Sequence, residues 1–264
     1  MTAPVAYTAL KALIEKYVMD YPKAANSRNF WRVPHVVTAK ADERFDILPE
    51  IAADDHALPR DLLKTAKTVI VFFVPFDKEL AKENNIGDIP CRNWGLAYES
   101  TNSLINSLCG QIKIFLGDAG YNSVLIPSTH NFNFKTLMAR WSHKHLGYIA
   151  NLGRFGVNAQ FITPSGCAGR LGSLVTEAEF GDNPLVVEKE LCFYKNGYKC
   201  LKCVEQCPVG AVSAETGIDR QKCWARLNSN LDNTQELAGL GKNTMVCGKC
   251  QVLMPCSLKV PKIK

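Results

Sequence analysis

Apolar residues recur at helical spacing in three parts of the chain. Near the N-terminus they lie three, four and seven positions apart, which predicts an amphipathic helix; they are Leu10, Leu13, Ile14, Tyr17 and Val18. A long helix is expected over residues 97–116, whose apolar positions fall on one face and which Gly117 and Gly120 follow as stop signals. A third helix is expected over residues 132–145, where the repeating residues are Phe134, Leu137, Met138, Trp141 and His145.

Four apolar stretches are typical of strands. Residues 68–75 (TVIVFFVP) are β-branched or aromatic and end in proline, which predicts a buried strand. Residues 123–127 predict a second strand. Residues 157–163 and 171–176 predict two more, joined by a glycine-rich turn over residues 165–170. Residues up to about 185 therefore form a domain that mixes helices and strands.

Beyond residue 185 the periodicity fades and cysteines become dense. The chain has 11 cysteines, of which seven fall between Cys200 and Cys256, with Cys192 just upstream. We expect a second, cysteine-rich domain over residues 186–264, after a first domain over residues 1–185.

Composition narrows the class of protein. With 264 residues, 47% hydrophobic and 21% charged, the chain is expected to be soluble and globular. Its longest apolar run, residues 69–76, is too short to cross a membrane, and no export signal opens the chain. A cytoplasmic location is therefore expected, where thiols stay reduced and a cysteine cluster indicates metal rather than disulfides. The net charge of +6 does not require a nucleic-acid partner.

The cysteine spacing indicates iron–sulfur clusters. Cys200, Cys203 and Cys207 are spaced x2 and x3, and Pro208 follows. In two-cluster ferredoxins the cysteine before such a proline binds the other cluster. By this analogy one [4Fe–4S] cluster is held by Cys192, Cys200, Cys203 and Cys256, and the other by Cys207, Cys223, Cys247 and Cys250.

Zinc ribbons are the alternative, because Cys-x2-Cys pairs also build four-thiolate zinc sites. They leave Cys207 and its proline unexplained, so two clusters are preferred. Of the other cysteines, Cys109 is expected in the core, Cys91 has no assigned role, and Cys167 is a candidate for a cofactor pocket.

Three motifs in the second half of the chain carry a family resemblance. They are Leu146-Gly-Tyr-Ile-Ala-Asn151, Ile218-Asp-Arg-Gln-Lys-Cys-Trp224 and Cys247-Gly-Lys-Cys-Gln251. Their order and spacing resemble epoxyqueuosine reductase and the related reductive dehalogenases, over roughly residues 65 to 256. In that family the first motif reads Leu-Gly-Trp-Ile-Gly-Lys and the last Cys-Asp-x-Cys-Gln.

The resemblance implies an α+β fold: a nitroreductase-like domain that holds base-off cobalamin, followed by a two-cluster ferredoxin-like domain. Two cysteines depart from the family pattern, since Gly197 stands where the first is expected and both Cys192 and Cys256 are displaced. The chain also ends at Lys264, without the helical repeats with which the queuosine enzymes grip tRNA, so activity on tRNA is not expected.

The resemblance also suggests site residues. The queuosine enzymes have a proton-donating Asp before the Leu-Gly motif; residues 128–133 contain no carboxylate, and His130 or Asn131 falls nearest. Tyr98 and Tyr148 are further candidate donors, although His130 also suits a helix cap and Tyr148 a core position. We expect His143 on the helix surface and His145 in the core. Candidate corrin contacts are Asn131, Leu146, Gly147, Ala150, Asn151, Gly153, Gly156, Gly166, Cys167 and Gly169.

These features predict a cobalamin-dependent reductase of a small organic molecule, supplied with electrons by a ferredoxin or flavodoxin. Two alternatives use the same clusters. One is an electron-transfer or activator protein that reduces a partner's corrinoid or flavin. The other is a reductase with flavin in the nitroreductase-like domain, since such folds bind flavin without a Rossmann glycine motif.

Overall fold

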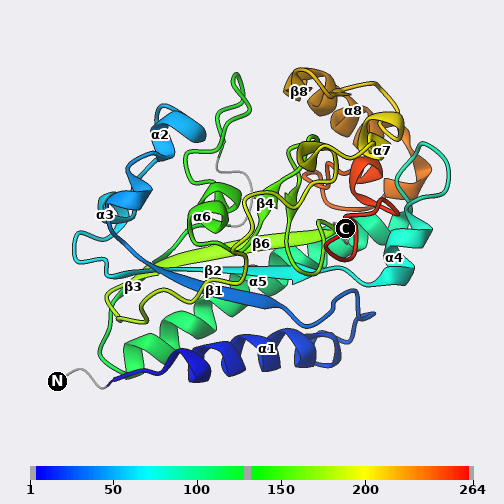
Figure 1. Cartoon of the computed structure of the whole chain (residues 1–264). Coiled ribbons are helices and arrows are strands. Elements are labelled where there is room, and N and C mark those ends of the chain that lie inside the picture. The colour runs from blue at the N-terminus through cyan, green and yellow to red at the C-terminus, as the bar shows by residue number, and fades with distance from the viewer. Residues whose placement is uncertain (1–3, 128–131, 262–264) are drawn as a thin grey trace. The chain divides into compact units, whose positions relative to one another are not determined.

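The computed structural model describes residues 4–127 and 132–261 of the chain (Figure 1). Contacts divide the chain into two compact units, each assembled from three segments. Unit 1 comprises Met1–Val74, Asn102–Leu152 and Arg170–Val187. Unit 2 comprises Pro75–Thr101, Gly153–Gly169 and Glu188–Lys264. The chain passes from unit 1 to unit 2 for the last time after Val187, two residues beyond the boundary expected at residue 185. Unit 2 also contains two earlier segments of the chain.

The main sheet has four strands in the order β1-β2-β6-β3. β1 (His35–Lys40) runs antiparallel to β2 (Thr68–Pro75), with His35 opposite Phe73. β3 (Ser123–Leu125) runs antiparallel to β6 (Gly169–Thr176), with Ser123 opposite Thr176. All eight residues of β2 are buried, which explains why this strand is the most apolar stretch of the chain. Strands β2 and β6 confirm two of the predicted strands.

Helices cover both faces of this sheet. Figure 1 shows α1 (Tyr7–Ala24) and the C-terminal part of α5 (Arg92–Asp118) on one side, and α6 (His143–Ile149) on the other. α1 buries Leu10, Ile14, Val18 and Pro22. Both α1 and α5 confirm the predicted helices.

Glycine in β6 lets α5 approach the sheet. A Cβ atom at Gly172 would lie 2.4 Å from Phe72 Cζ and 2.8 Å from Ile105 Cγ2. Neither contact is compatible with a side chain at this position, so Gly172 is required by the packing of α5 on β2 and β6.

The predicted helix over residues 132–145 is wrong. Phe132 and Ala139 form an isolated antiparallel bridge, and the helix begins only at His143. The side chain of Asn133 accepts hydrogen bonds from the backbone N–H groups of Lys135 at 2.8 Å and Thr136 at 3.3 Å. Such a local bond gives the backbone an alternative to the helix, which the spacing of apolar residues does not reveal.

Short elements complete both units. In unit 1 they are η1 (Glu43–Phe45), α2 (Leu48–Ile51) and α3 (Pro59–Leu62). In unit 2 they are α4 (Lys78–Glu83), β4 (Arg154–Phe155), β5 (Phe161–Ile162), η2 (Tyr194–Asn196), α7 (Lys202–Glu205), β7 (Val212–Ser213), β8 (Gly217–Ile218), α8 (Arg220–Asn233), η3 (Gln235–Leu237) and η4 (Lys249–Gln251). Of the strand expected over residues 157–163, only Phe161 and Ile162 form a strand, β5.

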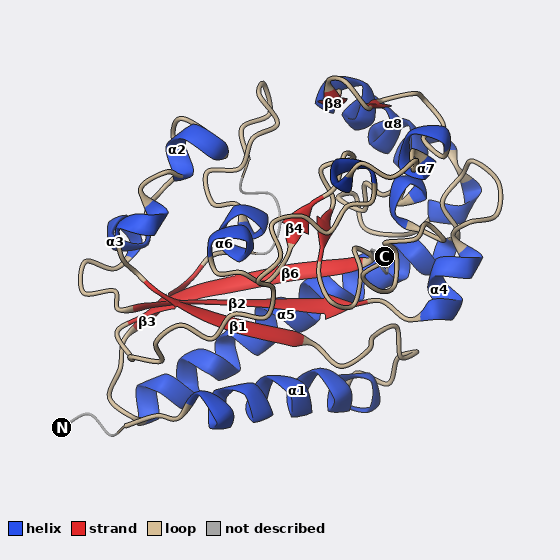
Figure 2. Cartoon of the chain, in the orientation of Figure 1, coloured by secondary structure: helices blue, strands red, loops and turns tan. Residues whose placement is uncertain are grey.

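The cysteine-rich segment consists mostly of short helices and loops, in contrast to the main sheet (Figure 2). Within residues 4–127 and 132–261, no helix combines the length and the apolar character that spanning a membrane requires.

Candidate functional site

Four cysteines of unit 2 line one cavity. They are Cys192, Cys200, Cys203 and Cys256, the set that the sequence assigned to one cluster. Cys200 and Cys203 flank the start of α7, whereas Cys192 and Cys256 come from loops 64 residues apart in the chain. Most of the remaining lining is apolar and includes Val157, Met254 and Pro255.

Burial and the neighbouring sulfurs disfavour a thiolate at Cys203 in this cavity. Burial, followed by the neighbouring sulfurs of Cys256, Cys192 and Cys200, raises the pKa of Cys203 to about 11. A thiolate here needs a positive partner, and iron supplies one. The donor set therefore fits a [4Fe–4S] cluster, in which each of four thiolates binds a different iron.

The other four cysteines gather around Cys250. Burial and then the sulfurs of Cys247, Cys223 and Cys207 raise the pKa of the Cys250 thiol. Cys203 of the first group acts on Cys250 more weakly, so the two groups are neighbours within unit 2. The backbone N–H of Ala211 donates to Cys207 Sγ at 3.1 Å.

Two buried polar side chains join the segment after α4 to the loop that carries Cys247 and Cys250. The Asn84 amide donates to Cys247 O at 2.9 Å, and its oxygen accepts from the Cys91 N–H at 3.0 Å. Lys249 Nζ donates to the carbonyl oxygens of Asn84 at 2.6 Å and Ile86 at 3.0 Å. Asn84 and Lys249 are both buried. Sequence reasoning missed these residues, because nothing near Asn84 links it to a cysteine 163 positions away.

Two more contacts fix the same loop. Gly248 has a φ of +74°, and a Cβ atom there would lie 2.3 Å from Trp94 Cε2. The buried side chain of Asn158 donates to Cys250 O. The loop is thus held from both ends by residues that lie far away in the sequence.

Within the parts of the chain that the structure describes, no three His, Cys, Asp or Glu side chains are grouped as ligands of a single metal ion. A [4Fe–4S] cluster does not require such a grouping, because each of its four ligands binds a different iron.

Comparisons with solved structures identify the fold of the chain. No protein-family model matches the sequence, and no curated protein matches it. Among solved structures, an epoxyqueuosine reductase from Bacillus subtilis is 17% identical with a TM-score of 0.56, and the match covers 96% of this chain and 67% of that chain. The chain shares the fold of epoxyqueuosine reductases.

Two further structures extend the likeness. An epoxyqueuosine reductase solved with an epoxyqueuosine-modified tRNA stem loop is 18% identical with a TM-score of 0.55, covering 94% of this chain and 66% of that chain. A catabolic reductive dehalogenase is 14% identical with a TM-score of 0.57, covering 86% and 30%. The resemblance inferred from the motifs is confirmed at the level of the fold, and this chain spans about two thirds of the reductases' length.

The candidate proton donors lie on different helices or outside the described residues. His130 and Asn131 lie outside the described residues. Tyr98 is half-buried on α5 in unit 2, and Tyr148 is 40% exposed on α6 in unit 1. Their catalytic roles stay predictions.

Three of the glycines proposed as corrin contacts are required by the protein's own packing. A Cβ atom at Gly153 would lie 2.2 Å from Ile162 O, and one at Gly166 would lie 2.3 Å from Ser257 O. A Cβ atom at Gly156 would lie 2.8 Å from the side chain of Asn158. No corrinoid is needed to explain the missing side chains at these positions.

The other candidate contacts lie around α6 and β6. Leu146, Gly147 and Ala150 are buried on or just after α6. Asn151 follows with a φ of +57°, and its carbonyl accepts backbone hydrogen bonds from two residues near the end of unit 1. Gly169 opens β6, and Cys167 is buried two residues before it. Contact with a corrinoid stays a prediction for all of them.

A buried histidine network in unit 1 was not foreseen. His143 Nδ1 lies 2.7 Å from Ser173 Oγ, which also accepts from Trp141 Nε1 at 3.0 Å. His143 Nε2 lies 3.3 Å from Pro127 O. His143 is buried rather than on the surface, and His145 is only half-buried, because α6 begins at His143 and not at residue 132.

We expect this network to make unit 1 less stable in acid. Burial lowers the pKa of His143 from 6.5 to about 4. Below pH 6.5 the unfolded chain binds a proton at this histidine, whereas the folded chain binds it only at about pH 4 and below. The free energy of unfolding therefore falls as the pH falls through this window. Between pH 7.5 and pH 5 the loss is about 2 kcal/mol for this group.

Urea unfolding at both pH values measures the loss, and His143→Gln is the comparison. The variant should have a smaller difference in unfolding free energy between the two pH values than the natural protein. An equal difference in both proteins would exclude His143 as the source.

Proposed function

We propose that this protein is a reductase that carries two [4Fe–4S] clusters and works with a base-off cobalamin on a small organic substrate. The main support is the cavity lined by Cys192, Cys200, Cys203 and Cys256, because a second group of four cysteines adjoins it in the same unit. The fold, which is that of epoxyqueuosine reductases, supports the reductase part of the proposal.

The residues of unit 2 that hold the clusters do three things. The eight cysteines supply four thiolates to each cluster, and a bound cluster accepts and releases one electron at a time. Buried Asn84 and Asn158 fix the backbone of the Cys247–Cys250 loop through its carbonyl groups. Lys249 places a buried positive charge beside Cys247. This positive charge complements the negative charge of the proposed cluster.

The cobalamin part rests on the fold and on the motif resemblance. At three of the predicted glycine contacts, Gly153, Gly156 and Gly166, the protein's own atoms already account for the absence of a side chain, so these glycines add no support to the cobalamin part. No step of the reaction is therefore assigned to a residue at those positions. A low-potential ferredoxin or flavodoxin is the proposed electron donor.

Anaerobic reconstitution tests the two parts separately. The protein is loaded with iron and sulfide, mixed with cob(II)alamin, passed through gel filtration, and examined by optical and EPR spectroscopy. We expect about eight irons per chain and one retained corrinoid with a base-off cobalt signal. Cys203→Ser and Cys250→Ser serve as controls, and each should perturb a different cluster.

The possible results have distinct meanings. Two clusters without retained corrinoid would overturn the cobalamin part and leave an electron-transfer protein, while released flavin would indicate the flavin alternative. Absence of both clusters would overturn the whole proposal. If corrinoid is retained, small organic substrates can be tested, and an epoxyqueuosine-containing tRNA stem loop serves as the comparison because one similar reductase was solved with it.

A further inference from the structure

One arginine of α8 lies on the helix face that carries Cys223, one of the second group of four cysteines. Arg226 and Asn230 follow Cys223 by three and seven positions on this helix, so the three side chains share one face. The buried side chain of Asn230 donates to Val246 O at 2.8 Å, directly before Cys247. This face of α8 is therefore packed against the loop that carries two more cysteines of the same group.

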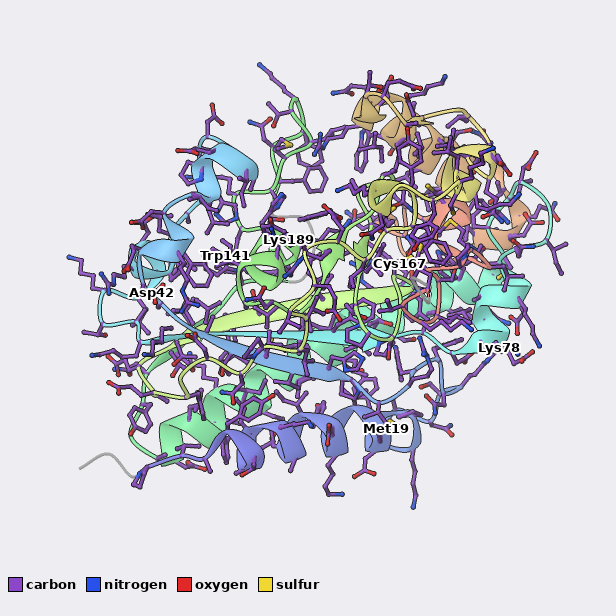
Figure 3. All side chains as sticks on the ribbon, in the orientation of Figure 1. Met19, Asp42, Lys78, Trp141, Cys167 and Lys189 are labelled. Atoms are coloured by element: carbon purple, nitrogen blue, oxygen red, sulfur yellow. The ribbon has the colours of Figure 1, made fainter. Side chains whose placement is uncertain are left out.

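The far end of the Arg226 side chain is held by another loop of unit 2. This loop covers residues 84–90 and follows α4, whose first residue, Lys78, is labelled in Figure 3. Arg226 Nη2 donates to Asp88 O at 2.8 Å. Another carbonyl group of the same loop accepts a hydrogen bond of 3.0 Å from Lys249 Nζ. The loop over residues 84–90 thus joins α8 to the segment that carries the second cysteine group, and it fixes where the guanidinium lies.

The Nε atom of Arg226 is a buried donor without an acceptor. It is shielded from solvent, and no atom of the residues that the structure describes accepts a hydrogen bond from it. Leaving such a donor unsatisfied costs about 1–3 kcal/mol, and more for a charged group. An iron–sulfur cluster held by the second cysteine group offers acceptors, because its sulfide and thiolate sulfurs carry negative charge. The orphaned Nε–H of Arg226 therefore fits the proposed cluster.

We propose that Arg226 donates a hydrogen bond from Nε to a sulfur of the second proposed cluster and thereby raises the reduction potential of that cluster. The inference rests on the proposed clusters but not on cobalamin. Reduction adds one electron from the donor protein, and the added negative charge is shared by the irons and sulfurs of the cluster. A cationic hydrogen-bond donor at a sulfur therefore stabilises the reduced form more than the oxidised form.

Redox titration of the reconstituted protein, followed by EPR, tests the inference with Arg226→Met and Arg226→Lys. The signal that Cys250→Ser removes identifies the second cluster. Arg226→Met should keep its full iron content but lower the ratio of reduced to oxidised second cluster at a fixed potential, on the order of tenfold. Arg226→Lys keeps the positive charge without the Nε donor and should lie between Arg226→Met and the natural protein. Arg220→Met is the matched control, because it removes the same charge from the exposed first residue of α8, where water screens it.

Pulsed EPR measures the hydrogen bond itself. Arginine is labelled with the heavy nitrogen isotope in its guanidinium group only, and the protein is reduced. The second cluster should show a coupling to this nitrogen in the natural protein and none in Arg226→Met. A change of packing alone does not produce such a coupling.

Several results would overturn the inference. They are an unchanged titration in Arg226→Met at full iron content, an equal shift in Arg220→Met, and no nitrogen coupling in the natural protein. Loss of the second cluster from both Arg226 variants would also overturn it, because Arg226 would then be needed for assembly. If only Arg226→Met loses the cluster, a lowered ratio in Arg226→Lys supports the inference and an unchanged ratio overturns it. If the natural protein forms no clusters, the proposed function fails instead, and iron analysis before the titration separates the two cases.

Discussion

Replacing Gly166 by alanine should remove one of the two proposed clusters, lowering the iron content from about eight to about four per chain. The new Cβ atom would lie 2.3 Å from Ser257 O and 2.5 Å from Leu258 N, which are backbone atoms that cannot turn away as a side chain can. The φ of +83° adds strain for any residue with a Cβ atom. The segment after Cys256 must shift, and Cys256 then leaves the cavity that it shares with three other cysteines.

Iron and acid-labile sulfide analysis measures this loss. Gly239→Ala is the control, because Gly239 has a similar φ of +78° but no atom within 4 Å of its added Cβ. The control carries only the backbone strain, roughly 1–2 kcal/mol, and should keep both clusters. A full iron content in Gly166→Ala would contradict the importance of this close approach.

Gly248→Ala should remove the other cluster. Its Cβ atom would lie 2.3 to 2.5 Å from three atoms of the Trp94 ring, and Trp94 is only 4% exposed. The loop must move away from the ring, and both Cys247 and Cys250 move with it. Iron content should again fall to about half, but the remaining EPR signal should differ from that of Gly166→Ala.

The pair of variants therefore distinguishes the clusters. Gly217→Ala is the control for Gly248→Ala, since its φ is +75° and its nearest neighbour is 3.9 Å from the added Cβ. Combining Gly248→Ala with Trp94→Leu removes the indole ring and should restore part of the lost iron. Identical EPR signals in Gly166→Ala and Gly248→Ala would argue against two separate sites.

The sequence predicted best where one physical requirement dominates a long stretch. β2 matches the expected limits of residues 68–75, because a strand buried on both faces must be apolar throughout. α5 contains the whole expected helix, since its apolar face is repeated over several turns. One cavity brings together Cys192, Cys200, Cys203 and Cys256, the set assigned to one cluster by analogy with two-cluster ferredoxins, and their binding of that cluster stays a prediction.

Prediction failed where local hydrogen bonds or distant contacts decide the structure. The Asn133 side chain stabilises a turn inside the expected helix over residues 132–145, and the spacing of apolar residues cannot register it. The assignment of residues 75–101 to unit 2 depends on contacts such as Asn84 with Cys247, which join positions far apart in the chain. β1 was missed because its six residues include a histidine, a threonine and a lysine.

The segmented construction of unit 2 has a consequence for its synthesis on the ribosome. Asn84 and Trp94 are made early but hold a loop that begins at Cys247, and the first cysteine group is complete only after Cys256. At 5–20 residues per second, about ten seconds or more separate these parts during translation. The nascent chain therefore exposes partial sets of thiols before either set is complete, and insertion of the proposed clusters is expected at the end of translation or later.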